Sequence, residues 1–296
     1  TAGSSLGMAI NTQAAEYWPD DGSGASVSAI VVEKETGTVL YEKNADTSHY
    51  PASITKVMTA LLALENCDLD EIVTFSEEAV YGNEGDTSHI AREVGEEMTL
   101  ENCLYGMMLE SANECAWAIG EHVGGGSMDK FVEMMNAKAK ELGCTGTHFA
   151  NPNGLPNPDH YVTARDMALI ARAAYQYPAF RKISSTRAYT IPADNKKAAY
   201  NCNNTHGMIS NHRGSSNLYE YALGGKTGYK DEAGNTLTAH FDQAKNPNWT
   251  LSADRKSVTL KFDLPAGVRD IRDYIRDNLP SNSILKLSFP GAKYMN

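Results

Sequence analysis

The hydrophobic pattern of this 296-residue chain changes its period twice, and the order of the changes constrains the fold more than any other feature. Apolar residues alternate with polar ones in Val27–Lys34 and Thr38–Glu42, on either side of a Gly-containing turn, which predicts a β-hairpin. After Pro51 the apolar residues recur with a helical period, and strand character returns around 223–228 and 236–242. Strands on both sides of a helical middle predict one interleaved α/β domain with a helical insertion.

Further helices are expected at about 99–122, 127–142 and 163–176 from the apolar spacing and the capping residues. Ser127 is the expected N-cap of the second of these helices, and Gly143 ends it. Residues 150–160 are so rich in Asn and Pro that they predict a shaped loop rather than regular structure. After about residue 239 the pattern predicts three more elements: a strand at 257–264, an amphipathic helix at 271–279 and a strand at 284–289.

Charge and composition exclude several classes of function. Lys plus Arg is 26 and Asp plus Glu is 37, so the net charge is 26 − 37 = −11, which argues against nucleic acid and anionic membranes as partners. The apolar runs, such as Val57–Leu64, are too short to span a bilayer. The five Cys form no C-x-x-C pair and the eight His form no H-E-x-x-H motif, so we do not expect a metal enzyme. The first residues contain no basic, apolar signal region, so the protein is either cytosolic or has lost its signal peptide.

Ser53 and Lys56 are the first candidates for chemistry. Three residues apart on one helix, they share a face, and a lysine amine whose pKa is lowered by burial can activate a serine hydroxyl. The helix N-terminus at Ser53 favours a developing anion. Alone, the pattern is more typical of an ordinary helix start with a surface lysine, because the S-x-x-K spacing recurs at Ser127–Lys130 and Ser283–Lys286.

Two tripeptides further along the chain carry complementary groups. Ser111-Ala112-Asn113 offers a hydroxyl and an amide that can move a proton and hold a substrate amide, although a turn or a helix cap explains it equally well. Lys226-Thr227-Gly228 lies in a strand-like context, where a lysine and a hydroxyl can bind a carboxylate and a glycine allows close backbone approach. Its alternative is a glycine-punctuated strand end.

The order S-x-x-K, S-x-N, K-T-G is the motif set of penicillin-binding proteins and serine β-lactamases. The surrounding segments, from about residue 25 to about residue 240, are similar to the low-molecular-weight D-alanyl-D-alanine carboxypeptidases. They include Pro51–Lys56, Met107–Asn113, Phe149–Leu155 and Gly225–Tyr229. The resemblance implies an antiparallel sheet flanked by helices, with a mainly helical subdomain.

The resemblance also implies roles. Ser53 would be the nucleophile, Lys56 its base, and Ser111 the relay of a proton to the leaving group. The implied substrate-binding residues are Asn113, Lys226, Thr227, Gly228 and Tyr229. Among them Asn113 would hold the substrate backbone and Thr227 its terminal carboxylate, and the backbone N–H groups of Ser53 and Tyr229 would form the oxyanion hole. Asn201-Cys202-Asn203 would be structural, and Cys115 is expected to be a buried thiol.

The implied function is a serine D-Ala-D-Ala carboxypeptidase without metal or cofactor, which trims peptidoglycan stem peptides through an acyl-enzyme and is inhibited covalently by β-lactams. An extracytoplasmic location follows from that substrate. The alternatives are a serine β-lactamase on the same fold and a catalytically silent module that binds wall peptides. We expect an exposed leader at 1–24, a catalytic domain at 25–250, and at 251–296 either the divergent end of that domain or the start of a small accessory domain.

Two departures from the family pattern affect these expectations. Ala112 stands where the family usually has Gly, and the arginine that assists Thr227 is unassigned among Arg255, Arg269 and Arg272. A third observation separates the two enzymes. Class A β-lactamases hydrolyse their acyl-enzyme with a glutamate that follows the S-x-N motif, but no Glu lies between Glu141 and Glu220. Only two carboxylates are close to the corresponding loop, Asp159 and Asp166, and the second has the spacing of a helix cap.

Overall fold

The computed structural model describes residues 26–83, 87–214 and 218–241, together with two short strands at 249–251 and 258–260. The chain divides into two compact units, one made of residues 1–45 and 243–296 and the other of residues 46–242. The predicted leader, the accessory elements after residue 261 and the three candidate arginines lie outside the described residues. The predicted division into domains therefore stays a prediction.

The first unit contains the predicted N-terminal hairpin. Strands β1 (Ala29–Val32) and β2 (Val39–Lys43) pair antiparallel, with a bulge between Val31 and Val32. The turn between them is held by the carboxylate of Glu33, which accepts hydrogen bonds from the backbone and the hydroxyl of Thr36. Strands β9 (Trp249–Leu251) and β10 (Val258–Leu260) form a second antiparallel pair.

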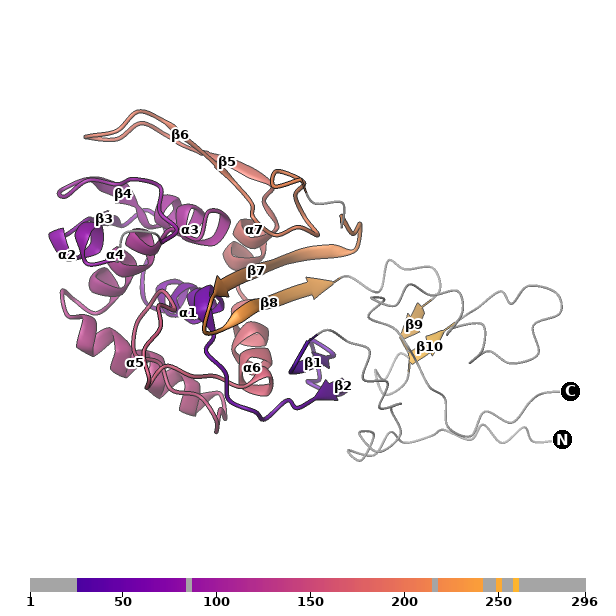
Figure 1. Cartoon of the computed structure of the whole chain (residues 1–296). Helices are drawn as coiled ribbons and strands as arrows, with labels where there is room; N and C mark the ends of the chain where they lie inside the picture. Colours follow the sequence, from indigo (N-terminus) through magenta and orange to yellow (C-terminus); the bar gives the residue numbers. More distant parts are fainter. Residues whose placement is uncertain (1–25, 84–86, 215–217, 242–248, 252–257, 261–296) are drawn as a thin grey trace, which may run out of the picture. The chain divides into compact units, whose positions relative to one another are not determined.

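Among the described residues, the second unit contains all the helices and the remaining strands (Figure 1). The helices, in chain order, are η2 (Ala52–Thr55), α1 (Lys56–Asn66), α2 (Glu77–Tyr81), α3 (Leu100–Leu109), α4 (Asn113–Val123), α5 (Met128–Glu141), α6 (Ala164–Ala174) and α7 (Pro178–Ser185). The strands form three antiparallel pairs: β3 (Ile72–Thr74) with β4 (Glu97–Thr99), β5 (Ala188–Ile191) with β6 (Tyr200–Asn203), and β7 (Ala222–Lys230) with β8 (Gly234–Phe241).

Helix α1 lies at the centre of this unit. Every residue from Lys56 to Ala63 is buried, and the helix contacts α3, α4, α5, α6 and α7. A helix that is apolar on all sides belongs inside a core, and the alternation of Ala with Leu and Met lets five neighbours approach it. The position of Lys56 at its first turn therefore places an amine in the core.

The single helix expected at about 99–122 is wrong: the chain forms α3 and α4, separated at residues 110–112. The apolar period continues across the break, so periodicity alone could not reveal it. The break is made by Ser111, whose φ of 63° is left-handed and incompatible with a continuous helix. The turn exposes the Ser111 hydroxyl to the inside of the site instead of to a helix face.

The predicted helix starts at Ser127 and Thr163 are confirmed. The Ser127 hydroxyl accepts the N–H of Lys130, and the Thr163 hydroxyl accepts the N–H of Asp166. The buried carboxylate of Asp166 accepts hydrogen bonds from the backbone N–H groups of Thr145 and Gly146 and from the Thr147 hydroxyl. Asp166 therefore fixes the loop that enters residues 150–160.

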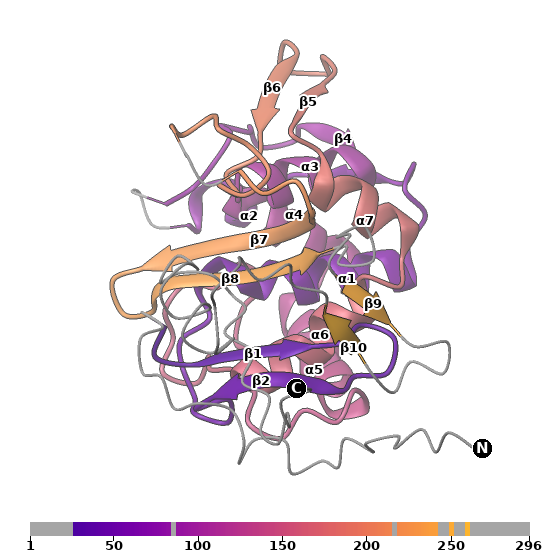
Figure 2. The same cartoon turned by 90° about the vertical axis from the view of Figure 1, so that its right-hand side faces the viewer.

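Strands β7 and β8 both contact η2, the turn that leads into α1. Figure 2 shows the two strands side by side. Helix α7 packs against β7, and α6 contacts β8. The sequence did not predict α2, α7 or the short pairs β3–β4 and β5–β6, because segments of three to eight residues contain too few apolar positions to define a period. Among the described residues, every helix is too short or too polar to span a bilayer.

Candidate active site

All three motifs converge within residues 46–242. Ser53 lies in the 3₁₀ turn η2, immediately after Ala52, whose φ of 50° is left-handed, and immediately before α1. Such strain in a non-glycine residue persists only where the surroundings enforce it, and it is frequent at reactive positions. The turn leaves Ser53 partly exposed beside Lys56, whose Nζ is 3.0 Å from the Ser53 Oγ.

Lys56 is fully buried and has three oxygen neighbours. Besides Ser53, its Nζ donates to the side-chain oxygen of Asn113 at 2.7 Å and to the backbone carbonyl of Asn153 at 2.7 Å. The two carbonyl oxygens can only accept, so they take both N–H bonds of a neutral amine. The nitrogen lone pair is then left to accept the proton of the Ser53 hydroxyl.

Electrostatics favour this neutral form. Burial lowers the pKa of Lys56 well below its ordinary value, and the positive charge of Lys226 lowers it further, while the Glu114 carboxyl opposes the shift. Because both amines lie in the same water-poor region, two positive charges there would repel strongly. Lys56 is therefore suited to act as a base at neutral pH.

Lys226 is the second buried amine, with 1% of its surface exposed. Its Nζ donates to the Ser111 Oγ at 3.1 Å and to the backbone carbonyl of Thr227 at 2.6 Å. Burial, with a smaller contribution from the Arg213 charge, lowers the pKa of Lys226 to about 7. Ser111 and Lys226 thus form a pair that can exchange a proton near neutral pH.

Strand β7, which carries the K-T-G motif, lies with its backbone close to Ser53. A Cβ added to Gly228 would lie 2.8 Å from the Ser53 backbone nitrogen, so only glycine lets β7 come this near. Thr236 on β8 donates its hydroxyl to the carbonyl of Pro51 at 2.8 Å, which fixes the strand pair to the start of η2. The Thr227 hydroxyl lies 3.1 Å from that of Thr205, a residue that the sequence analysis did not single out.

The predicted loop at 150–160 supplies more of the site than the sequence indicated. Asn153 provides the carbonyl that binds Lys56, and its side chain donates to the amide oxygen of Asn83 at 2.8 Å. Gly154 has a φ of 87°, and a Cβ there would lie 1.8 Å from the carbonyl oxygen of Ala52. An Asn-Gly pair is a turn signal, but its contact with the nucleophile's turn is tertiary and invisible in the sequence.

Two other residues that the sequence singled out, Ser127 and Asp159, lie apart from this arrangement. Ser127 caps α5, so its S-x-x-K spacing is structural, and Ser283–Lys286 lies outside the described residues. Asp159 is exposed and Cys115 is buried within the core. Tyr229 follows Gly228 with 61% of its surface exposed, and its hydroxyl bonds Asp231.

The segment around Asn201-Cys202-Asn203 is strand β6, as a structural role requires. Its neighbour Asn204 is the buried anchor: the side chain donates to the carbonyls of Ser184 and Thr186 and accepts the N–H of His206. This anchor holds Thr205 against β7.

The fold and this geometry define a serine peptidase in which a buried lysine, not a histidine, stands beside the nucleophile. The comparison with known proteins identifies the family: a protein-family model described as "D-alanyl-D-alanine carboxypeptidase" matches residues 13–251. The chain belongs to this family of serine peptidases, as the motifs predicted.

Individual proteins that are similar to this chain carry names of the same family. The D-alanyl-D-alanine carboxypeptidase DacF of Bacillus subtilis is 38% identical over 272 residues, which are 90% of this chain and 66% of that protein. The D-alanyl-D-alanine carboxypeptidase of Streptomyces sp. strain K15 is 34% identical over 71% of this chain and 74% of its own length. The crystal structure of the Streptomyces K15 DD-transpeptidase matches with a TM-score of 0.67 and 33% identity, covering 74% of this chain and 86% of that one. The predicted fold class is confirmed.

Proposed function

We propose that this chain removes the terminal D-Ala from peptidoglycan stem peptides ending in D-Ala-D-Ala, through an acyl-enzyme on Ser53. The observation that carries the proposal is the 3.0 Å contact between the Ser53 Oγ and a fully buried Lys56 whose pKa is lowered. A serine needs such a base to become a nucleophile. The names of the curated relatives indicate the D-Ala-D-Ala substrate.

In the acylation step, the Ser53 Oγ attacks the carbonyl carbon between the two D-Ala residues while its proton moves to the neutral Nζ of Lys56. The oxyanion that forms accepts hydrogen bonds from the backbone N–H groups of Ser53 and Tyr229, where one lost donor typically costs about 10²–10³ in rate. The approach of Gly228 to the Ser53 nitrogen supports this pairing, because it brings the two backbones side by side.

Expulsion of D-Ala requires a proton on the departing amine. Ser111 is the relay in this proposal: it donates its hydroxyl proton to the leaving nitrogen and regains one from Lys226, 3.1 Å away. A pKa of about 7 makes Lys226 a proton donor near neutral pH. Asn113, held by Lys56, offers its amide N–H group to the substrate backbone.

The terminal carboxylate of the substrate binds beside Thr227. Thr205 supports the proposed role of Thr227, since their hydroxyls are within hydrogen-bond distance. Arg213 is a described arginine whose charge reaches Lys226, and we assign to it the positive charge that complements the carboxylate. This arginine comes from the loop before β7, whereas Arg255, Arg269 and Arg272 lie outside the described residues.

Deacylation separates this activity from that of a β-lactamase. The carboxylate of Asp166 is occupied by Thr145, Gly146 and Thr147, and Asp159 is exposed, so neither has the placement of a dedicated base for water. Once Lys56 has given up the proton it took from Ser53 and Lys226 has regained the one it supplied, the neutral Lys56 activates the water. A bulky penicilloyl group obstructs that water far more than the small acyl group left by D-Ala release. A penicilloyl-enzyme that lasts minutes or longer follows from this difference.

The test combines D-Ala release from a diacyl-Lys-D-Ala-D-Ala peptide with labelling by a fluorescent penicillin. Wild type should release D-Ala and become labelled, with the label mapped to Ser53, and Ser53→Ala should lose both properties. Ser127→Ala is the matched control, since it removes the other described S-x-x-K serine. Labelling without D-Ala release would indicate the silent module, and rapid multiple turnover of penicillin without D-Ala release would indicate the lactamase.

The proposed partners are the stem peptide as substrate and β-lactams as covalent inhibitors. An extracytoplasmic location is part of the proposal, because the stem peptide is a cell-wall component and the curated relatives are bacterial. Fractionation of the source cells, with the labelled protein followed through envelope and cytosol, tests the location.

A further inference from the structure

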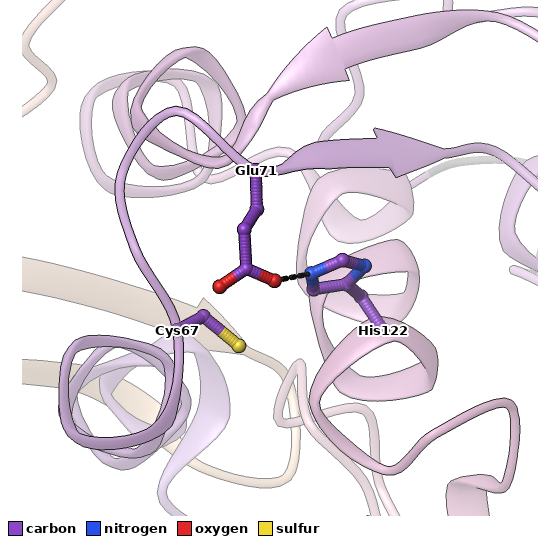
Figure 3. Close-up of side chains that lie close together, drawn as sticks. All are labelled: Cys67, Glu71 and His122. Atoms are coloured by element: carbon purple, nitrogen blue, oxygen red, sulfur yellow. Dashed lines mark hydrogen bonds and ion pairs between the residues drawn. The ribbon is translucent and has the colours of Figure 1, made fainter.

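Three side chains of metal-ligating type meet on the helical side of the molecule, away from the three motifs. Cys67, Glu71 and His122 each place one ligand atom within 4.8 Å of the other two. Figure 3 shows the thiol, the carboxylate and the imidazole pointing toward one another, with the His122 Nε2 2.8 Å from the Glu71 Oε2. Among the described residues, which include all five Cys and all eight His, no other group of three meets this condition.

We propose that Cys67, Glu71 and His122 bind a zinc ion, with water as the fourth ligand. Thiolate sulfur, imidazole nitrogen and carboxylate oxygen are the donors that Zn²⁺ accepts, and tetrahedral ligation at about 2.0–2.3 Å places them roughly 3.5 Å apart. The thiol proton leaves to solvent when the sulfur binds, and the imidazole binds in its neutral form. The atoms therefore need to move by about 1 Å at most to reach this geometry.

The backbone around the cluster is already fixed by other contacts. Glu71 accepts the N–H of Leu100 on its carbonyl, and its second carboxylate oxygen accepts the N–H of Asp68 at 2.6 Å. Cys67 ends α1 with its N–H on the carbonyl of Ala63. These bonds orient the carboxylate from outside the proposed site, as the outer contacts of metal ligands commonly do.

The local charge and the access also suit a cation. The carboxylates of Glu71 and Asp68 lie close enough to Cys67 to act on it electrostatically, so the site concentrates negative charge that an ion would neutralise. Beside His122 lies a groove of about 540 Å³ that Thr74, Ser76 and Glu121 also line. The side chains of His122 and Glu71 are 24% and 41% exposed, so an ion and its water ligand can reach them from solvent.

The position of the cluster gives the ion a structural consequence. Cys67 directly follows α1 and His122 lies in the last turn of α4, while Lys56 and Asn113 are the first residues of the same two helices. Each helix has 11 residues, so the ion would lie on the order of 16 Å from the lysine–asparagine contact. The ion would tie the far ends of the two helices whose near ends hold the proposed base.

The sequence analysis expected no metal because it searched for ligands at short, regular spacings. Here the ligands come from a helix end, a loop and a second helix, and His122 is 51 residues from Glu71. Only the packing of α4 against α1 and β3 brings them together.

The experiment uses the full chain, freed of metal with a chelator and titrated with Co²⁺ as a spectroscopic probe for zinc. We expect one equivalent to bind, with a sulfur-to-cobalt charge-transfer band that Zn²⁺ abolishes. Cys67→Ser should lose the band, and Glu71→Gln and His122→Gln should each weaken binding by about tenfold or more. Cys144→Ser is the matched control, because it removes another half-buried thiol outside the cluster and should leave the band unchanged.

Two further readouts keep the result decisive. Zn²⁺ should raise the unfolding temperature of wild type and Cys144→Ser but not that of Cys67→Ser. Labelling of Ser53 by fluorescent penicillin in every variant reports that the fold is intact, independently of metal binding. A wild type without the charge-transfer band at stoichiometric cobalt, or a band that survives in Cys67→Ser, would overturn the proposal.

Discussion

Two glycines with almost the same backbone conformation offer a direct test of how the loop at 150–160 supports the site. Gly154 has a φ of +87° and Gly126 has a φ of +88°, so replacement by Ala costs each about 1–2 kcal/mol of left-handed strain. Their surroundings differ: an added Cβ would lie 1.8 Å from the carbonyl oxygen of Ala52 at Gly154, and nothing lies within 4 Å of it at Gly126.

The consequence of Gly154→Ala follows from that contact. A carbon and an oxygen cannot approach much closer than about 3.2 Å, so the loop and the η2 turn must separate by more than 1 Å. The neighbouring Asn153 then withdraws its carbonyl from Lys56, and Ser53 shifts with Ala52. A misplacement of this size costs about 10² in rate, so we expect acylation by penicillin to slow by about a hundredfold.

The assay measures the rate of fluorescent penicillin labelling together with thermal unfolding. Gly126→Ala should label at the wild-type rate and lose only its strain energy, which is about 2–4 °C in unfolding temperature for each kcal/mol. Gly154→Ala should lose more stability and most of its labelling rate. If Gly154→Ala remains folded and labels as fast as Gly126→Ala, the loop at 150–160 does not position Lys56 and Ser53 for acylation.

Three other substitutions test single groups. Lys56→Arg keeps a positive charge at every accessible pH and should abolish acylation. The rate of wild-type acylation should rise with pH over about pH 6–9, because the neutral amine becomes more populated. A flat wild-type profile would contradict a neutral amine as the base. Asp166→Asn places an amide N–H against the N–H of Gly146 and the hydroxyl of Thr147, and should lower the free energy of unfolding by about 1–3 kcal/mol. The lifetime of the penicilloyl-enzyme should stay unchanged. A changed lifetime would show that Asp166 takes part in deacylation. Lys226→Met should lose D-Ala release and yet unfold at a higher temperature than wild type at pH 7.

The sequence predicted the local features of this molecule well. The β1–β2 hairpin and the caps at Ser127 and Thr163 depend on neighbouring residues, and the motif order indicated which side chains to examine. The helix start expected at Ser53 is wrong, because Ser53 lies in the 3₁₀ turn η2 and α1 begins at Lys56. The contacts that bring the proposed catalytic residues together join residues far apart in the sequence. Lys56 and Asn113 are 57 residues apart, and the carbonyl that completes the Lys56 environment belongs to a backbone with no side-chain signature.

The break at Ser111 is a second feature that depends on long-range contacts and that the sequence pattern did not predict. Helical periodicity continues from α3 into α4 because both helices bury one side in the same core. What interrupts them is a left-handed serine, whose cost is met by tertiary contacts such as the N–H of Asn113 on the carbonyl of Ser88. A pattern of apolar residues contains no record of those contacts.

The burial of Lys226 explains the opposite effects expected for Lys226→Met. Its pKa falls from 10.5 in the unfolded chain to about 7 in the folded protein, so the folded state binds fewer protons between these values. The free energy of unfolding therefore rises with pH across that window, and the full cost, on the order of 5 kcal/mol, applies below about pH 7.

Methionine removes this cost and gives up two hydrogen bonds, to Ser111 and Thr227, worth about 1 kcal/mol each. A net gain of about 3 kcal/mol at pH 7 remains; it should fall to zero near pH ~9 and become a net loss of about 2 kcal/mol as the pH approaches 10.5. The measurement is the difference in unfolding free energy between variant and wild type as a function of pH, and this difference includes the relief of Lys56 from the charge of Lys226. A difference that stays constant from pH 7 to 10 would show that Lys226 is not held near neutrality, and the proton relay through Ser111 would lose its source.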